Sequence, residues 1–173
     1  VGTIQGFIDV FLAIPYYKTL YHRRPVRVDD DIYFENHFPG YKLRYSLSKR
    51  ANGEKLLYDY RLRKGDNLTL KLSHTSFPYK KTTDTYQRIL AIKKELRESG
   101  FLCFDDAYIL AQEYIEQFPG IVNILRKRFP YVFIDEMQDM DRHQYDMLEK
   151  LFGHAQDVSY QRIGDKNQAI FNA

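Results

Sequence analysis

The stretch Tyr131-Val-Phe-Ile-Asp-Glu-Met-Gln-Asp139 decides the fold class, because a short apolar run ends in two adjacent carboxylates. Continuous apolar runs of this length are typical of buried strands in a parallel α/β sheet. Folds of this class bind their ligands at the carboxyl ends of such strands. The stretch therefore predicts a strand from Tyr131 to Glu136 and makes Asp135 and Glu136 candidate site residues. By itself it is also compatible with an ordinary strand end followed by a helix cap.

A second stretch, Arg162-Ile-Gly-Asp-Lys-Asn-Gln-Ala-Ile-Phe171, contains the end of another expected strand, which leads to Ile163. Between the two strands, Asp141 and Gln144 predict a capped helix that ends at Gly153. A strand, a helix and a strand within about 30 residues form a βαβ unit. The two strands should therefore be parallel and joined by a right-handed crossover.

Four further helices are predicted from caps, stops and apolar periodicity. The first has an apolar stripe with helical spacing, and the chain after it is expected to be irregular to about Pro39. The stripe consists of Phe7, Val10, Phe11 and Ile14. The predicted limits of the four helices are Thr3 to Pro15, Asp84 (with Gln87) to Gly100, Asp105 to Phe118, and Ile121 to Phe129.

Three alternating segments lie in the first half of the chain, at residues 41–47, 56–62 and 68–72. Asn52-Gly53 between the first two is a strong hairpin signal, because both residues tolerate positive φ. The segments predict a three-stranded antiparallel meander over residues 41–73. A face with many cations is a candidate surface for a phosphate backbone, and the alternative is a solvated face that protects the sheet edges. The cations expected on the outward face are Lys42, Arg44, Arg61, Arg63 and Lys71.

The composition is that of a globular protein, since 44% of the 173 residues are apolar and 28% are charged. No apolar run approaches the roughly 20 residues that span a bilayer, and no leader peptide is expected. A single cysteine favours a reducing compartment and a cytoplasmic protein. Residues 1–100 carry 19 Lys or Arg against 11 Asp or Glu, whereas residues 101–173 carry 7 against 12. This asymmetry suggests contact with a polyanion in the first part and a cation-handling site in the second, with ordinary surface charge as the alternative.

Adjacent carboxylates at the end of a strand suit phosphoryl transfer, because one can hold Mg²⁺ while the next activates the attacking water. The sequence pattern is also compatible with two other functions. One is a non-catalytic nucleic-acid-binding module that uses the basic meander, and the other is a nuclease that uses the carboxylates. No metal site is expected elsewhere, because Asp29-Asp-Asp31 suggests a solvated turn and the five histidines lack ligand spacing. Cys103 is expected in the core.

The order of the motifs resembles that of the UvrD/Rep-type superfamily 1 DNA helicases. Residues 131–139 are similar to their Walker B segment, an apolar run followed by Asp-Glu-x-Gln-Asp. Residues 162–171 are similar to their next motif, Gly-Asp-x-x-Gln-x-Ile-Tyr. Gly2-Thr-Ile-Gln-Gly-Phe7 resembles the Thr-x-His-x-Phe segment of the family, with Gln5 in place of the histidine. Phe101-Leu-Cys-Phe-Asp-Asp-Ala107 resembles the Phe-x-Asp-Leu segment before Walker B.

The resemblance implies an α/β fold, a part of a RecA-like P-loop NTPase motor domain with an inserted α+β subdomain. Residues 1–14 would be its start helix, residues 15–95 the inserted subdomain with the meander, and residues 96–173 the motor core. The implied activity of the intact protein is ATP-dependent movement on DNA and unwinding. The phosphate-binding pattern Gly-x-x-x-x-Gly-Lys-[Ser/Thr] does not occur in the 173 residues, so this piece alone is expected to be inactive. The strand-rich meander departs from the mostly helical insert of better-known relatives.

The resemblance also implies roles for residues near the nucleotide. Asp135 would coordinate Mg²⁺, Glu136 would be the catalytic base, and Gln168 would sense the γ-phosphate of ATP. Gln138 and Asp165 would support the nucleotide and the metal. Mg²⁺ and ATP are thus the implied cofactors of the intact protein.

Other residues would contact DNA by the same resemblance. Thr3 and Gln5 would lie along the DNA path, and Phe171 would stack on a base of single-stranded DNA. The implied partners are single-stranded and forked DNA, with a nuclease or a repair protein left open as a further partner. The fragment itself is expected to be a monomer.

Overall fold

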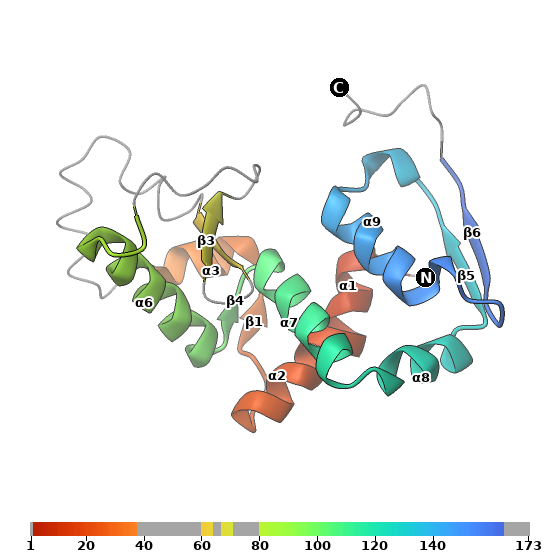
Figure 1. Ribbon diagram of the computed structural model, residues 1–173, viewed down its shortest axis with the longest axis horizontal. Coiled ribbons are helices and arrows are strands. Elements are labelled where there is room, and N and C mark those ends of the chain that lie inside the picture. Colours follow the sequence, from red (N-terminus) through yellow and green to blue (C-terminus); the bar gives the residue numbers. More distant parts are fainter. Residues whose placement is uncertain (1, 38–59, 64–66, 71–79, 165–173) are drawn as a thin grey trace. The chain divides into compact units, whose positions relative to one another are not determined.

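The computed structural model of the chain describes residues 2–37, 60–63, 67–70 and 80–164 (Figure 1). The chain divides into two compact units. One consists of residues Phe7–Ala111, and the other combines Val1–Gly6 with Gln112–Ala173. Each unit is described separately below.

The predicted βαβ unit is present in the second of these units. Strand β5 (Tyr131–Ile134) pairs in parallel with β6 (Ser159–Arg162), in a register that sets Ile134 opposite Arg162. A 3-10 turn (Met137–Asp139), helix α9 (Arg142–Leu148) and a π-helical turn (Glu149–Gly153) connect the two strands. The parallel pairing expected from the sequence is therefore confirmed, and the strand itself ends one residue before Asp135.

The capping box of α9 is also confirmed. The Asp141 carboxylate accepts a hydrogen bond from the Gln144 backbone N–H at 3.0 Å, and the Gln144 side chain accepts one from the Asp141 N–H at 3.3 Å. Helix α8 (Gly120–Arg128) is tied to the π-helical turn, because the Arg126 Nε donates to the Leu151 carbonyl at 2.7 Å. The buried side chains of this part of the chain are Leu125, Met147, Leu148, Leu151, Phe152 and Val158.

Strand β5 is less buried than the sequence predicts. The side chains of Tyr131 and Phe133 are 71% and 61% exposed, while Val132 and Ile134 are half-buried. A strand is buried on both faces only when elements cover both sides of its sheet. Within the described residues, nothing covers the face that carries Tyr131 and Phe133, so the expectation of a fully buried strand is wrong here.

The first helix runs further than predicted. It consists of α1 (Ile4–Ile8), a π-helical turn (Asp9–Ala13) and α2 (Ile14–Tyr21). Pro15 does not end it: the proline lies in the first turn of α2, directly after the π-helical turn. Its buried side chains are Ile8, Leu12, Ala13, Tyr16 and Tyr17.

The predicted stripe of this helix is only partly confirmed, since Phe7, Phe11 and Ile14 are half-buried. A π-helical turn interrupts the helix here, because the Ile14 N–H bonds to the Asp9 carbonyl, five residues back. Val10, which the stripe placed in the core, is 58% exposed. The predicted cap is confirmed, since the Thr3 Oγ1 accepts a hydrogen bond from the Gly6 N–H at 3.0 Å.

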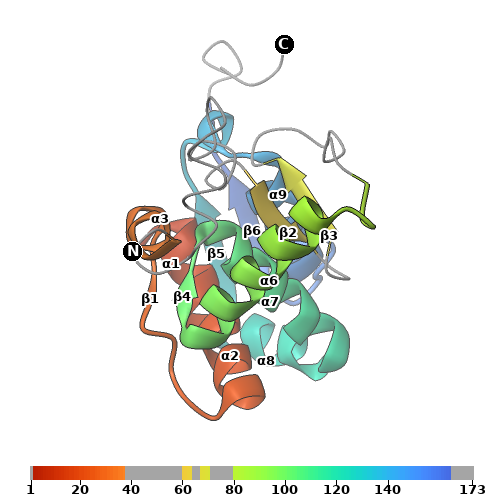
Figure 2. The ribbon, with the colours of Figure 1, turned by 90° about the vertical axis from the view of Figure 1, so that its left-hand side faces the viewer.

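The segment expected to be irregular contains a strand and a helix. Strand β1 (Arg27–Val28) pairs in parallel with β4 (Phe101–Leu102), beside α3 (Asp30–His37) and α6 (Asp84–Ser99) (Figures 1 and 2). The Asp29 carboxylate caps α3 by accepting from the N–H groups of Asp31 and Ile32 at 2.9 and 3.2 Å. The prediction of a solvated turn at residues 29–31 is therefore wrong, because Asp30 is buried.

Helices α6 and α7 (Phe104–Gln117) lie where the sequence places them, but their caps differ. Thr83, not Asp84, caps α6, since its Oγ1 accepts from the Tyr86 N–H at 3.4 Å. Helix α6 ends at Gly100, as predicted, in a left-handed conformation with φ of 93°. The buried cluster between these elements contains Tyr33, Ile92, Leu96 and Cys103, with Phe101 packed against it, so the core position of Cys103 is confirmed.

Two strands of the predicted meander are described. Strand β2 (Tyr60–Arg63) pairs antiparallel with β3 (Asn67–Leu70), with Tyr60 opposite Leu70 and Arg63 opposite Asn67. The first predicted strand, at residues 41–47, and the Asn52-Gly53 turn lie outside the described residues. The three-stranded meander as a whole stays a prediction.

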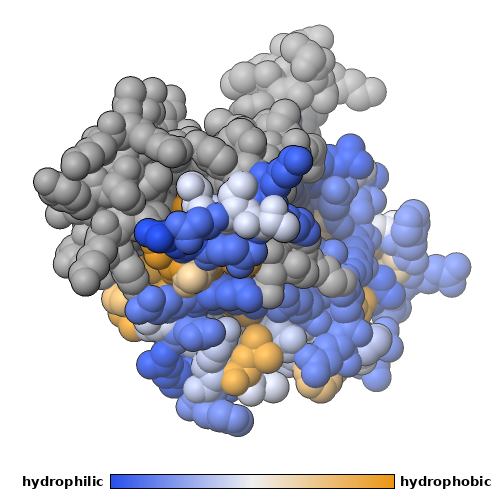
Figure 3. Space-filling view, turned by 60° about the vertical axis from the view of Figure 1, so that its left-hand side comes forward, coloured by the Kyte–Doolittle hydropathy of each residue, from blue (hydrophilic) through white to orange (hydrophobic). Residues whose placement is uncertain are grey.

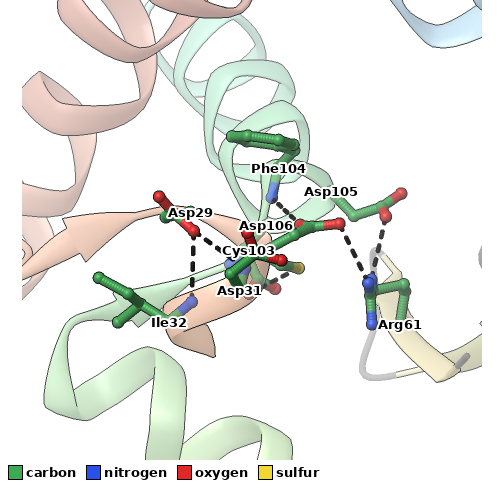
Figure 4. A network of polar contacts seen from close by, with 9 residues as sticks. Asp29, Asp31, Ile32, Arg61, Cys103, Phe104, Asp105 and Asp106 are labelled. Carbon is green, nitrogen blue, oxygen red and sulfur yellow. Dashed lines mark hydrogen bonds and ion pairs between the residues drawn. The ribbon is translucent and has the colours of Figure 1, made fainter. Parts of the chain in front are cut away.

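Arg61 corrects the prediction of a basic outward face on this sheet (Figure 4). Its side chain is fully buried, with the guanidinium 3.3 Å from the carboxylates of both Asp30 and Asp105. It also lies 5.5 Å from the centre of the Tyr33 ring. A buried guanidinium needs such partners to replace its lost hydration. Arg61 therefore cannot belong to an exposed DNA-contact surface in this structure.

The carboxylates around Arg61 also organise the start of α7. Asp30 accepts a hydrogen bond from the Phe104 N–H at 3.0 Å through its other oxygen. Asp106 accepts from the backbone N–H and the thiol of Cys103, at 3.1 and 3.2 Å. These side chains cap the helix, so the prediction of Asp105 as the cap of this helix is wrong.

The described part of the surface is mainly polar on the face seen in Figure 3, where hydrophobic residues form only small patches. Within the described residues, no helix has both the length and the apolar character needed to cross a membrane.

Candidate functional site

The two predicted carboxylates lie directly after β5. Asp135 and Glu136 are both exposed to solvent, and the Glu136 backbone N–H donates to the Asp135 carboxylate at 2.9 Å. Glu136 adopts a left-handed backbone conformation, with φ of 53° and ψ of 43°. This conformation is unfavourable for a residue with a side chain and persists only where its surroundings hold it.

Contacts with the next residues hold Glu136 in place. The side-chain amide nitrogen of Gln138 donates a hydrogen bond to the Glu136 carboxylate. The Asp139 N–H donates to the Glu136 carbonyl at 3.0 Å and closes the 3-10 turn. Gln138 is thus in contact with a proposed catalytic carboxylate, whereas the sequence only suggested a place near the nucleotide.

The loop after β5 touches the end of β6. The Met137 N–H donates to the Ile163 carbonyl at 3.0 Å, and the Ile163 N–H donates to the Ile134 carbonyl at 2.8 Å. A Cβ atom on Gly164 would lie 2.8 Å from the Gln138 Oε1 and 2.9 Å from the Met137 Cβ. Only glycine fits this approach without a shift of its neighbours, so the two predicted motifs do meet at one edge of the sheet.

Arg162 is a charged contact near this edge that the sequence reasoning missed. Its Nη1 lies 2.8 Å from the Glu149 Oε1 and donates to the Tyr145 hydroxyl at 3.2 Å. Burial and the Glu149 charge raise the pKa of Tyr160 to about 12, and the Arg162 guanidinium lies 5.5 Å from the ring centre of that tyrosine. The signal that could have found it was a charged residue at the end of an expected strand, two residues before Gly164.

The structure describes only some of the other predicted site residues. Thr3 caps α1, and Gln5 is half-buried within that helix, so their DNA contacts stay predictions. For Arg63 the structure describes the backbone in β2. The residues that lie outside the described part of the chain are Lys42, Arg44, Lys71, Asp165, Gln168 and Phe171.

The donor set at the end of β5 fits Mg²⁺ bound together with a nucleotide. Within the described residues, no group of three or more His, Cys, Asp or Glu side chains could hold a metal by itself. Mg²⁺ commonly takes one or two carboxylates from the protein and its other ligands from phosphates and water. Asp135, exposed directly after β5, is suited to be the protein's carboxylate in such a set.

Most of the chain matches a known family. Residues 35–172 match the model of the UvrD/REP helicase N-terminal domain. The chain belongs to this family. The matched region contains Asp135, Glu136 and Gly164, so the UvrD/REP match covers both loops described above.

Individual relatives agree with this family assignment. The chain is 31% identical over 121 residues to an ATP-dependent helicase/nuclease subunit of Natranaerobius thermophilus, an alignment that covers 68% of the chain and 9% of the relative. It is 33% identical over 82 residues to the RecBCD enzyme subunit RecB of Escherichia coli, covering 46% and 7%. It is 28% identical over 79 residues to the ATP-dependent DNA helicase PcrA of Bacillus subtilis, covering 46% and 10%. The chain thus spans a tenth or less of these UvrD/REP relatives.

Proposed function

We propose that this chain is part of the first, RecA-like motor domain of an ATP-dependent DNA helicase or translocase. The intact protein would couple Mg²⁺-ATP hydrolysis to movement on single-stranded DNA and to unwinding. The observation that carries the proposal is Glu136, which follows Asp135 at the carboxyl end of β5 and is held by Gln138. Family membership and the names of two relatives, the helicase PcrA and the ATP-dependent helicase/nuclease, support it.

The residues at the end of β5 lie so that each could take a different role in ATP hydrolysis. Asp135 would hold Mg²⁺, and bound Mg²⁺-ATP would supply the transferable phosphoryl group and neutralise its charge. Glu136 would accept a proton from the attacking water, and Gln138 would orient the Glu136 carboxylate. Asp165 would support the metal site, and Gln168 would sense the γ-phosphate.

The DNA contacts proposed from the resemblance remain those of Thr3, Gln5 and Phe171. The basic meander face, without Arg61, would be a second contact with nucleic acid; its members are Lys42, Arg44, Arg63 and Lys71. Single-stranded and forked DNA are the proposed partners of the intact protein. A nuclease-bearing partner is also proposed, because one relative is named as part of a helicase/nuclease and another as part of the RecBCD enzyme.

The test is ATP hydrolysis by the intact protein with and without single-stranded DNA, beside its Glu136→Gln variant. Loss of the base should lower the DNA-stimulated turnover by at least about a hundredfold. Asp157→Asn is the matched control, because it neutralises an exposed acid outside both loops and should leave turnover unchanged.

Two results would contradict the proposal, the first in the role of Glu136 and the second in the motor itself. Equal turnover in the Glu136→Gln variant and the wild type would exclude Glu136 as the base. No turnover in any variant, with DNA binding retained, would mean a helicase-like scaffold that acts as a nucleic-acid-binding module.

A further inference from the structure

Arg162 connects the end of β6 to the helix that follows the loop of Glu136. We infer that Arg162 is a positioning residue: with Glu149 and Tyr145 it fixes the loop after β5 against the end of β6, and so keeps Glu136 aligned for turnover. The inference rests on the proposed function for its catalytic consequence. Its structural part is the alignment of the loop after β5 with the end of β6, and the contacts that support this alignment can be tested separately.

Helix α9 forms one side of this connection. It begins at its cap, Asp141, two residues after the 3-10 turn that contains Gln138. The capping box between Asp141 and Gln144 fixes the start of the helix, and only Met140 separates it from the 3-10 turn. Its other end continues into the π-helical turn, whose first residue is Glu149. A movement of Glu149 would therefore pass along α9 to the loop.

Strand β6 forms the other side. Arg162 is its last residue and lies opposite Ile134, the last residue of β5. The next residue, Ile163, accepts the hydrogen bond from the Met137 N–H, and Gly164 packs against Gln138. The contacts thus form a closed ring that leads from the loop through α9 and the Glu149–Arg162 pair back to the loop.

The surroundings of Glu149 favour a single arrangement of this pair. A Cβ on Gly153 would lie 2.5 Å from the Glu149 Oε2, so the glycine leaves the space that the carboxylate occupies. The Glu149 charge raises the pKa of Arg162, so the guanidinium stays protonated beside it. Tyr145 and Tyr160 then hold the guanidinium by a hydrogen bond and a ring contact.

The pair is partly exposed, with side-chain exposures of 43% for Arg162 and 23% for Glu149. Ion pairs of this kind contribute little to global stability. A role limited to stability would therefore have small effects on turnover. A positioning role predicts a loss of turnover that is out of proportion to the loss of stability.

The experiment compares kinetics of the intact protein with those of its Arg162→Ala variant. Because misplacement of reacting groups is costly, kcat with single-stranded DNA should fall about tenfold, while KM for ATP stays within about twofold. The Kd for single-stranded DNA and the melting temperature should change little. Arg162→Lys should restore part of kcat, since lysine keeps the positive charge beside Glu149 but lacks the planar guanidinium that packs near the Tyr160 ring.

Two further variants sharpen the comparison. Glu149→Gln should lower kcat as Arg162→Ala does, and the double variant should lose no more than either single one. Arg142→Ala is the matched control, because Arg142 pairs with Asp146 at 2.9 Å on the exposed side of the same helix. A loss of kcat in Arg142→Ala equal to that in Arg162→Ala would overturn the inference. So would additive effects of the two single changes on kcat in the double variant.

A second measurement separates this inference from the proposed function. Amide hydrogen exchange of Met137 reports its bond to Ile163, and Arg162→Ala should accelerate it whereas Arg142→Ala should not. Unchanged exchange would overturn the alignment of the loops whatever the kinetics. Accelerated exchange in a protein without DNA-stimulated turnover would support the alignment and reject the motor.

Discussion

Arg61 is the residue whose environment differs most from its sequence pattern. Alternation along β2 places it opposite the apolar face, yet both Arg61 and Leu62 are buried. The reason is that Asp30 and Asp105 offer two carboxylates to the guanidinium from α3 and α7. A buried charge of this kind is costly to leave without its partners.

Replacing Arg61 with alanine should destabilise the protein by about 3–5 kcal/mol, because Asp30 and Asp105 would stay buried without a cation. Arg88→Ala is the control, since Arg88 pairs with Asp84 on the exposed surface of α6 and should cost at most about 0.5 kcal/mol. The measurement is the free energy of unfolding in urea. Similar losses of unfolding free energy in the two variants would show that the contacts of Arg61 with Asp30 and Asp105 do not stabilise the fold more than a surface ion pair does.

Lys93 makes stability depend on pH near neutrality. Burial, followed by the neighbouring Arg61 charge, lowers the pKa of Lys93 from 10.5 to about 7, and its Nζ lies 4.7 Å from the centre of the Tyr33 ring. Between these two pKa values the unfolded chain binds the proton and the folded chain does not. Stability from this group should therefore rise as the pH increases from 7.

The opposing groups limit the range in which this rise can be observed. Burial raises the pKa values of Cys103 and Tyr33, so the unfolded chain loses their protons first, from about pH 8.5 for the thiol and about pH 10 for the phenol. Stability from these two groups falls above those pH values and opposes the rise from Lys93. Burial also raises the pKa of Asp106. Urea unfolding between pH 6.5 and 8.5 should thus show a rise in the wild type that Lys93→Met flattens. An unchanged slope in the variant would assign the rise to another group.

At the scale of elements, Gly100 joins α6 to the β1–β4 pair. Its carbonyl accepts from the Val26 N–H at 2.8 Å, and a Cβ at Gly100 would lie 2.9 Å from that same nitrogen. With φ of 93°, the position combines a left-handed conformation with a close backbone approach. The end of this helix and the start of the strand pairing therefore depend on one glycine.

Gly100→Ala should destabilise the protein by more than about 1 kcal/mol, because the conformation and the contact both disfavour a side chain. Gly120→Ala is its control, since the first residue of α8 has no atom within 4 Å of an added Cβ, and the change should be neutral or slightly stabilising. Thermal unfolding of both variants provides the comparison. A Gly100→Ala protein as stable as the Gly120→Ala protein would contradict the close approach.

Elements set by local signals were predictable, whereas those set by distant contacts were not. The cap of α9 and the stop of α6 depend on residues within one turn of the helix end. Strand β1 is two residues long and exists through its pairing with β4, more than 70 residues later. The π-helical turn in the first helix likewise had no signal in the apolar periodicity.

At the scale of the whole molecule, the chain covers a tenth or less of the length of the relatives named above. It contains the carboxylates after β5 but not the Gly-x-x-x-x-Gly-Lys-[Ser/Thr] pattern that cradles phosphates. We expect the 173 residues alone to hydrolyse no ATP, because positioning and charge stabilisation of the phosphates supply most of the catalysis. The assay compares the purified chain with its Glu136→Ala variant. Turnover above that of the variant would contradict the expectation.

The sequence by itself determined the parallel βαβ unit, the position of Asp135 and Glu136 at a strand end, and the family resemblance that the UvrD/REP match confirms. These features depend on periodicity and caps that lie close together in the chain. The tertiary structure alone decided the burial of Arg61 and the link from Arg162 to Glu149. Both join charges from different elements, which only the fold brings together. A charge such as Arg61 enters the interior only where the fold supplies it with a partner.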